Sequence, residues 1–526
     1  MKVRNPTLTA ILLLALVAVG AGTRMVALEK VPPGFAPDEA TNGYDAYCLL
    51  KTGRDQHGYY LPLVMRSFND YRMPLFIYSI VPFIGLFSLN VNSVRMASAF
   101  WGILTIPAGY WLGRNLYGRQ TGLITAFLLA LSPWLIPLNR IALESGMVTC
   151  LLTLSMAIFW QWHNTHKAHW LPLGTSVAAL CIYTYSTAKL LIPGFLALIG
   201  ILWFKERKNL SIRAVLIAAG IFLILVIPVV YLTIRYREPM QARYNQIAVF
   251  RQDRSFYESL SKATKNFVNH FSISYLFIRG DADTLQHPPF GGQLYWIQAP
   301  LLLLGILWGW RSEKRELLLF LLGWLFLTAL PPALTRPNLP NSAHSLRNLP
   351  AVVPFQILTA YAAARILGHP SLGKRAKHAI AILLVILLVG QGTWFLYKYY
   401  TVYPSLAAGR FEDGIKEMIT EMDKYDDQHS TVYFTDRIGW PYIYVAFFTK
   451  YDPEKFLAAP PVRSDQLFAP VERLGNYHVV PNIEEVYSST GSGLFIGEPD
   501  SFPDVTPLTV IHRPTDGKPR YKIVSK

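Results

Sequence analysis

Long uncharged apolar runs set the strongest limit on the folds open to this sequence. Segments such as 11–19, 214–231, 317–330 and 380–390 contain no charged residue, and each sits in a run that approaches the ~20 residues needed to cross a bilayer. Composition agrees, because 52% of the residues are hydrophobic and only 16% are charged, which is too apolar for a soluble protein with such runs. We therefore predict an α-helical polytopic membrane protein.

About eleven runs are long enough to be spans, allowing for tilt and short ends. They cover residues 7–28, 94–113, 120–138, 144–162, 170–185, 189–204, 212–233, 294–310, 317–334, 349–365 and 378–397. A further apolar run, 74–89, must be placed as well.

The net charge of +16 would suggest a nucleic-acid partner in a soluble protein. Here Lys and Arg cluster in short loops between the apolar runs, where they set membrane orientation. We therefore expect no nucleic-acid partner.

The distribution of basic loops decides how 74–89 is placed. If this run crosses the membrane, the basic turn 113–120 falls outside; if it lies in the interface, that turn and the later basic loops fall inside, as charge bias favours. The inside loops then carry Lys2, Arg4, Arg114, Arg119, Lys167, Lys205, Arg207, Lys208, Arg213, Arg311, Lys314, Arg315, Arg365, Lys374, Arg375 and Lys377, against Arg140, Arg336 and Arg347 outside. We predict an interfacial helix at 74–89, a cytoplasmic N-terminus and an extracytoplasmic C-terminus in the plasma membrane.

Three larger segments then lie outside, namely 29–93, 234–293 and the tail 404–526. The tail is polar, with strand-like runs at 431–435, 477–480, 494–496 and 508–512 and an amphipathic stretch at 411–422. We predict a transmembrane domain over 1–403 and a small α+β extracytoplasmic domain over 404–526.

The cysteines and the N-terminus add two smaller expectations. Cys48, Cys150 and Cys181 lack metal-ligand spacing, and a disulfide framework is not expected. The N-terminal apolar segment is long and lacks a clear small-residue cleavage site, so we interpret it as an uncleaved first span.

Two adjacent carboxylates, Asp38 and Glu39, follow the first span behind a proline-rich approach. A carboxylate at this boundary can deprotonate an acceptor hydroxyl or hold a divalent cation beside a phosphate. The alternative is structural, because Pro-Asp-Glu also marks a helix start.

Arg72 and Asp70 stand just before the predicted interfacial helix. A guanidinium at headgroup depth suits a lipid phosphate, and ordinary interfacial anchoring is the alternative. Further along, Arg140 and Glu144 are four apart at the second outside turn and would share a face if helical. An acid at the mouth of an apolar span indicates either a functional group or a structural ion pair.

Three more polar residues fall on the predicted outer face. Lys189 is a candidate phosphate contact, and Arg347 is a second candidate that stays charged. His344 could support the site or be a hydrogen-bonded loop histidine. No phosphate-binding glycine loop, zinc motif or nucleophile elbow occurs in the sequence.

Taken together, these pieces resemble the GT-C glycosyltransferases, specifically the protein mannosyltransferase and aminoarabinose transferase group (family 39-like). The resemblance covers roughly residues 1–365. It rests on Asp38-Glu39, the Gly-Arg-Asp…Gly…Leu-Pro stretch at 53–62, Asp70…Arg72…Pro74-Leu75…Tyr78, Arg95, Ser132-Pro133-Trp134, Asn139-Arg140…Glu144 and His344-Ser345-Leu346-Arg347.

The resemblance implies roles for particular residues. The first-loop acid of the family acts as catalytic base or site organiser, which points to Asp38 with Glu39 beside it. A second-loop acidic or basic residue supports the site, which points to Arg140 and Glu144. It also implies an interfacial helix where 74–89 lies.

Two departures affect the expected acceptor. The His-Pro-Pro-Leu-Gly-Lys stretch of many eukaryotic mannosyltransferases is replaced by Tyr71-Arg72-Met73-Pro74-Leu75, and the 234–293 loop is too short for their lectin-like domain. These differences favour a bacterial relative with an acceptor other than protein O-mannosylation sites.

We therefore expect inverting transfer of a sugar from a polyprenyl-phosphate donor to an extracytoplasmic lipid, glycan or protein. Catalysis is expected at Asp38 and Glu39, with Asp70, Arg140, Glu144 and His344 in support and Arg72, Lys189 and Arg347 on the lipid phosphate. Asp38, Arg140, Glu144 and Arg347 are expected to share one pocket. No cofactor is certain, and a divalent ion at Asp38 and Glu39 stays open.

Two alternatives belong to other classes. A flippase of lipid-linked glycans would place its charges near the bilayer midplane beside broken helices. A non-catalytic scaffold would instead bind cell-wall polymer through the tail 404–526.

Overall fold

The structure is a computed structural model. It describes residues 6–68, 70–204, 210–251, 253–335, 343–426, 431–459, 461–463 and 471–526. The basic residues Lys2, Arg4, Lys205, Arg207, Lys208 and Arg336, used above for orientation, lie outside these ranges. The chain divides into two compact units, which are described separately: unit 1 comprises 1–26, 98–237 and 244–401, and unit 2 comprises 27–97, 238–243 and 402–526.

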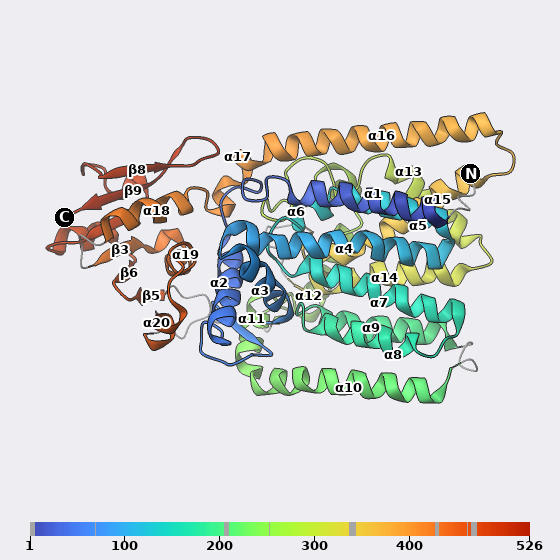
Figure 1. Ribbon diagram of the computed structural model, residues 1–526, viewed down its shortest axis with the longest axis horizontal. Coiled ribbons are helices and arrows are strands. Elements are labelled where there is room, and N and C mark those ends of the chain that lie inside the picture. Colours follow the sequence, from blue (N-terminus) through green and yellow to red (C-terminus); the bar gives the residue numbers. More distant parts are fainter. Residues whose placement is uncertain are drawn as a thin grey trace. The chain divides into compact units, whose positions relative to one another are not determined.

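Unit 1 is a bundle of long helices, several of which run side by side (Figure 1). Its helices, long and short, are α1 (Pro6–Met25), the larger part of α4 (Val91–Tyr117), α5 (Arg119–Ala130), α6 (Leu135–Leu138), α7 (Ser145–Thr165), α8 (Trp170–Ile182), α9 (Ala188–Leu202), α10 (Ile212–Arg235), the two ends of α11 (Arg237–Ile247), α12 (Phe256–Asn269), α13 (Gln298–Trp310), α14 (Arg315–Ala333), α15 (Val352–Gly368) and α16 (Lys374–Thr401).

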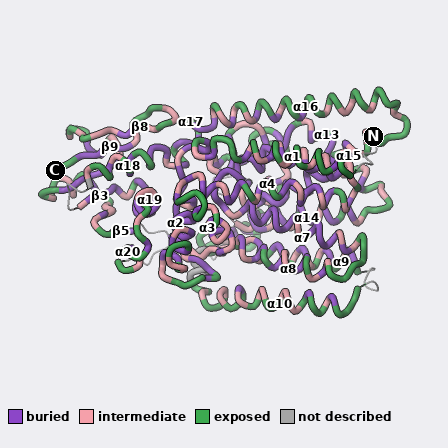
Figure 2. Tube along the Cα trace, in the orientation of Figure 1, coloured by how far each residue is buried: buried purple, intermediate pink, exposed green. Residues whose placement is uncertain are grey.

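The burial pattern of unit 1 separates inner from outer helices. Helix α7 is buried along most of its length, whereas α10 and α16 expose almost all of theirs (Figure 2). The exposed side chains are apolar, as at Ile224 and Ile386. Helices that expose apolar side chains all round belong in lipid, where their backbone groups are satisfied internally.

Close helix packing inside unit 1 relies on small residues. A Cβ on Gly122 would lie 2.6 Å from the carbonyl oxygen of Tyr110, and one on Gly305 would lie 2.4 Å from that of Leu358. Small residues let neighbouring backbones approach closely, which is how helices associate in lipid.

Six helices among the described residues are both long and apolar enough to cross a bilayer: α1, α7, α10, α14, the stretch Leu349–Gly368 and α16. The shorter apolar helices α3 (Leu75–Phe87), α8, α9 and α13 also coincide with predicted runs. The predicted multi-pass helical fold is confirmed, whereas the number of spans, the orientation and the interfacial position of 74–89 stay predictions.

Unit 2 combines the first predicted outer segment with the tail. It contains α2 (Pro37–Thr52), the hairpin β1 (Met65–Ser67) and β2 (Asp70–Arg72), and α3 (Leu75–Phe87), which packs against α2. From the tail come α17 (Tyr403–Ala407), α18 (Ile415–Asp426), α19 (Pro441–Phe448), α20 (Pro453–Ala458) and α21 (Ile483–Ser489).

The tail also carries a seven-stranded sheet in the order β4-β5-β6-β3-β7-β9-β8. Its strands are β3 (Val432–Thr435), β4 (Val462–Arg463), β5 (Val471–Leu474), β6 (Tyr477–Val480), β7 (Leu494–Gly497), β8 (Thr509–His512) and β9 (Pro519–Ser525). Strand β3 pairs in parallel with β6 and β7, and the other pairs are antiparallel. The predicted α+β character of the tail is confirmed.

The tail and the first outer segment share one hydrophobic core within unit 2. Phe35 packs on Phe447 with ring centroids 4.7 Å apart, and Tyr44 packs on Phe456 at 5.2 Å. Gly34 has a φ of +56°, and a Cβ there would lie 2.2 Å from the carbonyl oxygen of Phe411, so only glycine fits. Helix α2 is therefore supported from the tail along its length.

Candidate functional site

The predicted site residues fall into two groups, one in each unit. Asp38, Glu39, Asp70 and Arg72 belong to unit 2, and Arg140, Glu144, Lys189, His344 and Arg347 belong to unit 1.

Helix α2 presents the two adjacent carboxylates at its first turn. Pro37 occupies the first helical position, where its missing N–H is no loss. Glu39 accepts a hydrogen bond from the Ala36 N–H through Oε2 at 3.1 Å, which satisfies a donor that the helix leaves open. Negative charge here also suits the positive end of the helix dipole.

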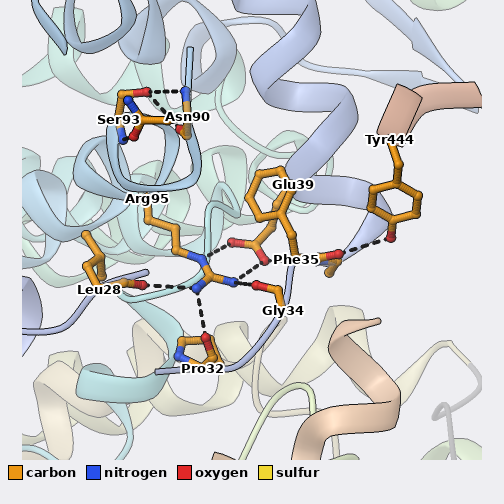
Figure 3. A network of polar contacts seen from close by, with 10 residues as sticks. Leu28, Pro32, Gly34, Phe35, Glu39, Asn90, Ser93, Arg95 and Tyr444 are labelled. Atoms are coloured by element: carbon orange, nitrogen blue, oxygen red, sulfur yellow. Dashed lines mark hydrogen bonds and ion pairs between the residues drawn. The ribbon is translucent and has the colours of Figure 1, made fainter. Parts of the chain in front are cut away.

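Glu39 is clamped by Arg95, as Figure 3 shows. Nε of Arg95 donates to Oε1 of Glu39 at 2.9 Å and Nη2 donates to Oε2 at 3.0 Å, and both side chains are fully buried. A bidentate pair of this kind fixes geometry as well as charge. Glu39 is therefore withdrawn from solvent by its partners.

The remaining donors of Arg95 hold the approach to α2. Nη1 donates to the carbonyl oxygens of Leu28 at 3.0 Å and Pro32 at 2.9 Å, and Nη2 donates to that of Gly34 at 2.9 Å (Figure 3). Tyr444 supports the same segment by donating its hydroxyl to the carbonyl of Phe35 at 3.0 Å. Burial, the larger effect, and the nearby Glu412 carboxylate raise the pKa of Tyr444, so the hydroxyl remains a donor.

Asp38 differs from its neighbour because 48% of its side chain is exposed. It accepts a charged hydrogen bond from Nη2 of Arg72, whose side chain is 16% exposed. Nη1 of Arg72 also lies 3.4 Å from Oδ1 of Asn42 on the next turn of α2. The arrangement leaves Asp38 reachable from solvent and orients it through one guanidinium.

The short hairpin β1–β2 positions Arg72. Met65 pairs with Arg72, and Ser67 pairs with Asp70. Asp70 accepts a hydrogen bond from the N–H of Tyr71 at 2.8 Å, and as alternate residues of one strand Asp70 and Arg72 share a face. Asp38 and Arg72 are therefore partners in the structure, while Glu39 faces Arg95.

Arg140 caps the end of α1 in unit 1. It is fully buried, donates to the carbonyl oxygens of Thr23 at 3.2 Å and Val26 at 2.8 Å, and lies over the ring of Tyr400 at 5.1 Å. Cations stabilise the carbonyl end of a helix. Residues 139–144 form a loop between α6 and α7, so Arg140 and Glu144, the N-cap of α7, do not share a helical face.

Lys189 stands at the start of α9. Its Nζ donates to Oγ1 of Thr233 on α10 at 3.2 Å, so this half-buried cation links two helices.

The 344–347 turn is held by a buried polar network. Oδ2 of Asp281 accepts from the N–H of Ser345 at 2.8 Å, Nε2 of Gln293 donates to Oγ of Ser345 at 2.5 Å, and Nε1 of Trp134 donates to the carbonyl of Ser345 at 3.2 Å. Arg347 is half-buried and donates through Nη1 to Oγ1 of Thr335 at 2.5 Å. The turn is therefore fixed from several segments far apart in the chain.

His344 is neutral in this setting. Burial, the nearby Arg347 guanidinium and His270 hold the pKa of His344 well below its ordinary value. Its backbone N–H donates to Nε2 of His270 at 3.1 Å. A neutral, buried imidazole contributes no positive charge for an anion, which makes Arg347 the cation of this turn.

Sequence reasoning missed several of these residues. Arg24 is buried and donates to the carbonyls of Leu129 and Ala130. Asp281, His270 and Gln293 lie between α12 and α13, where no sequence motif marks them as site residues. The sequence does mark Arg95 and Arg24 as candidates, because each is an isolated cation inside or beside an apolar run.

The described residues contain no cluster that could hold a metal ion and no disulfide bond. Within the described ranges, no three His, Cys, Asp or Glu side chains lie close enough to hold a metal ion. Cys48, Cys150 and Cys181 are buried free thiols.

Comparisons with known proteins bear on this geometry. A family model described as dolichyl-phosphate-mannose-protein mannosyltransferase matches residues 41–238, a segment that contains Asp70, Arg72, Arg140, Glu144 and Lys189. A search of curated protein sequences returned no match.

Two solved structures are similar over most of the chain. One is ArnT from Cupriavidus metallidurans bound to undecaprenyl phosphate, with a TM-score of 0.60, 14% identity, and coverage of 99% of this chain and 98% of that chain. The other is the oligosaccharyltransferase AglB from Archaeoglobus fulgidus, in complex with an inhibitory peptide and a dolichol-phosphate, with a TM-score of 0.54, 12% identity, and coverage of 94% and 69%.

The described helices and the matched segment give a multi-pass membrane fold similar to that of known membrane glycosyltransferases. More particularly, residues 41–238 match the protein mannosyltransferase family, so the predicted resemblance is confirmed. The bacterial source stays a prediction.

The buried ion pair generates the first prediction. Glu39→Gln leaves the Arg95 charge buried without its counter-charge, which should lower the free energy of unfolding by roughly 3–5 kcal/mol. Thermal unfolding of the purified protein measures this. Arg437→Gln, which removes an exposed partner of Glu498, is the matched control and should change stability by less than about 1 kcal/mol. Equal effects of the two variants would contradict the assigned importance of the buried pair.

Two buried histidines of unit 1 generate a pH prediction. Burial lowers the pKa of both His270 and His287 to about 4, against about 6.5 in the unfolded chain. Above pH ~6.5 both states are neutral; below it the unfolded state takes up protons and stability falls as the pH drops toward 4. Melting temperature should therefore decrease from pH 6.5 to 4.5, and less steeply in His287→Gln than in the parent protein.

Proposed function

We propose that this protein transfers a sugar from a polyprenyl-phosphate donor to a hydroxyl of an extracytoplasmic acceptor, with inversion at the anomeric carbon. The GT-C fold, the mannosyltransferase family match and the undecaprenyl phosphate and dolichol-phosphate named for the similar structures support a lipid-linked donor. The flippase alternative has no support among these relatives.

One observation supports the choice of base. Of the two adjacent carboxylates, Asp38 is half exposed beside Arg72, while Glu39 is fully buried against Arg95. A general base must reach the proton it removes. We therefore assign proton removal to Asp38 and positioning of the helix start to Glu39.

The proposed step balances as a displacement. Asp38 takes the proton of the acceptor hydroxyl while its oxygen attacks the anomeric carbon, and the bond from that carbon to the phosphate oxygen breaks. The electron pair leaves with the polyprenyl phosphate. Cations beside the departing phosphate stabilise its growing negative charge and lower the barrier. Arg347 and Arg72 are the first candidates for this role, and Lys189 is the third.

Supporting roles follow from the contacts of each residue. Arg140 caps α1, Glu144 begins α7, and Asp70 shares the strand face of Arg72. His344 is neutral and holds its turn. A divalent ion at Asp38 would have only this one half-exposed carboxylate of the pair, because both oxygens of Glu39 are occupied by Arg95.

Orientation forms part of the proposal. From the basic loops we propose that the N-terminus lies in the cytoplasm and the tail outside. Under this arrangement the segments that carry Asp38 and Arg347 both lie on the outer face, and 74–89 lies in the interface.

The base assignment predicts the effect of Asp38→Asn. Because a positioned base contributes about 10²–10⁴ in rate, transfer from radiolabelled polyprenyl-phosphate sugar should fall by at least about 100-fold at unchanged expression and melting temperature. Asp423→Asn, on the exposed face of α18, is the control and should retain full activity. Normal turnover in Asp38→Asn would remove Asp38 from the mechanism.

The phosphate assignment predicts a different pattern for Arg347. A charged hydrogen bond contributes roughly 1.5–3 kcal/mol, so Arg347→Gln should raise the KM for the lipid donor about 10- to 100-fold. The KM for the acceptor should stay unchanged, and Arg347→Lys should recover part of the loss. An increase confined to the acceptor KM would contradict donor binding at this turn.

A further inference from the structure

Helix α12, in the outer segment between α10 and α13, has an unusual distribution of side chains. The stripe that packs inside the protein is small and polar: Ser259, Ala263, Asn266 and the capping residue His270 are buried. The apolar residues are turned outward instead. Phe256, Tyr257, Leu260 and Val268 are all exposed, with Tyr257 at 82%.

This exposed stripe follows helical periodicity. Tyr257, Leu260, Thr264 and Val268 recur at intervals of three and four, so they lie along one side of the helix. A depression of about 560 Å³ follows this side, with Lys265 on its wall. An apolar face with a basic flank is typical of a helix that lies along a membrane surface.

Contacts with α14 place α12 at the membrane boundary. Nδ2 of Asn266 lies 3.3 Å from the carbonyl oxygen of Ala333, the last residue of a helix able to cross the bilayer, and 3.4 Å from that of Thr335, two residues beyond its end. The ring of Phe267 packs on Phe326 at 5.4 Å. Phe326 is 52% exposed on that spanning helix and stands seven residues, or about 10 Å, before its end.

We infer that α12 lies in the membrane interface with its Tyr257–Val268 stripe in contact with phospholipid acyl chains and Lys265 at headgroup height. A helix fixed beside a lipid-exposed side chain of a spanning helix is already at acyl-chain depth. Its outward apolar stripe then contacts lipid rather than water, which removes the unfavourable exposure of these side chains.

The interfacial position of α12 also affects the turn that carries Arg347, and this second inference rests on the proposed function. His270 follows directly after α12. Its Nε2 accepts from the His344 N–H, and its Nδ1 lies 2.7 Å from the carbonyl of Asn266, so Nδ1–H donates and the ring is neutral. Attachment of α12 to the bilayer thus holds the 344–347 turn at the height of lipid phosphates.

The test uses the full-length protein in phosphatidylcholine–phosphatidylglycerol liposomes. Nitroxide labels on Leu260→Cys and Val268→Cys should be more accessible to oxygen, which partitions into acyl chains, than to a water-soluble nickel complex. A label on Lys424→Cys, on exposed α18, should show the reverse. Labels at 260 and 268 that match the Lys424→Cys label would overturn the inference.

A second arm separates this inference from the proposed function. Leu260→Asp with Val268→Asp should raise the KM for the lipid donor several-fold without changing the KM for the acceptor, and Leu260→Ala with Val268→Ala should have a smaller effect. Lipid-accessible labels with no sugar transfer by the parent protein would refute the function and leave the lipid contact standing. Lipid-accessible labels with an unchanged donor KM would refute only the coupling to the turn.

Discussion

The buried pair of Glu39 and Arg95 is the interaction on which the start of α2 in unit 2 depends. Both side chains are fully excluded from water, and every oxygen of the carboxylate is engaged. Desolvating two charges is unfavourable unless geometry and additional hydrogen bonds compensate. The carbonyls of Leu28, Pro32 and Gly34 supply those bonds, so the approach to α2 becomes rigid. Asp38, one residue earlier, is therefore held in a fixed position although its side chain is half exposed.

Unit 1 also satisfies its buried polar groups through internal contacts. Arg24 and Arg140 donate to main-chain carbonyls near helix ends, and Ser345 is held by Asp281, Gln293 and Trp134. Polar groups in a lipid-embedded protein must be satisfied internally. The networks that do so also fix the turn carrying Arg347. The same contacts therefore satisfy buried polar groups and position Arg347, the proposed phosphate contact.

Adjacent residues can have opposite roles for a simple geometric reason. Successive positions in the first turn of a helix point about 100° apart, so Glu39 faces the interior and Asp38 faces Arg72. The sequence identified Asp38 and Glu39 as candidates but could not show which carboxylate is buried and which is exposed. The same limitation applies to Arg140 and Glu144, whose spacing suits a helix while the chain there forms a loop.

The sequence by itself determined the helical membrane architecture, the α+β tail and the family resemblance, because apolar runs, strand alternation and local motifs are written in neighbouring residues. It also located Asp38, Arg72 and Arg347 as candidates. Only the tertiary structure decided that Glu39 is occupied by Arg95, that His344 is buried and neutral, and that α12 turns its apolar side outward. Each of these depends on contacts between segments tens to hundreds of residues apart, and no local pattern records which distant partner a side chain will meet.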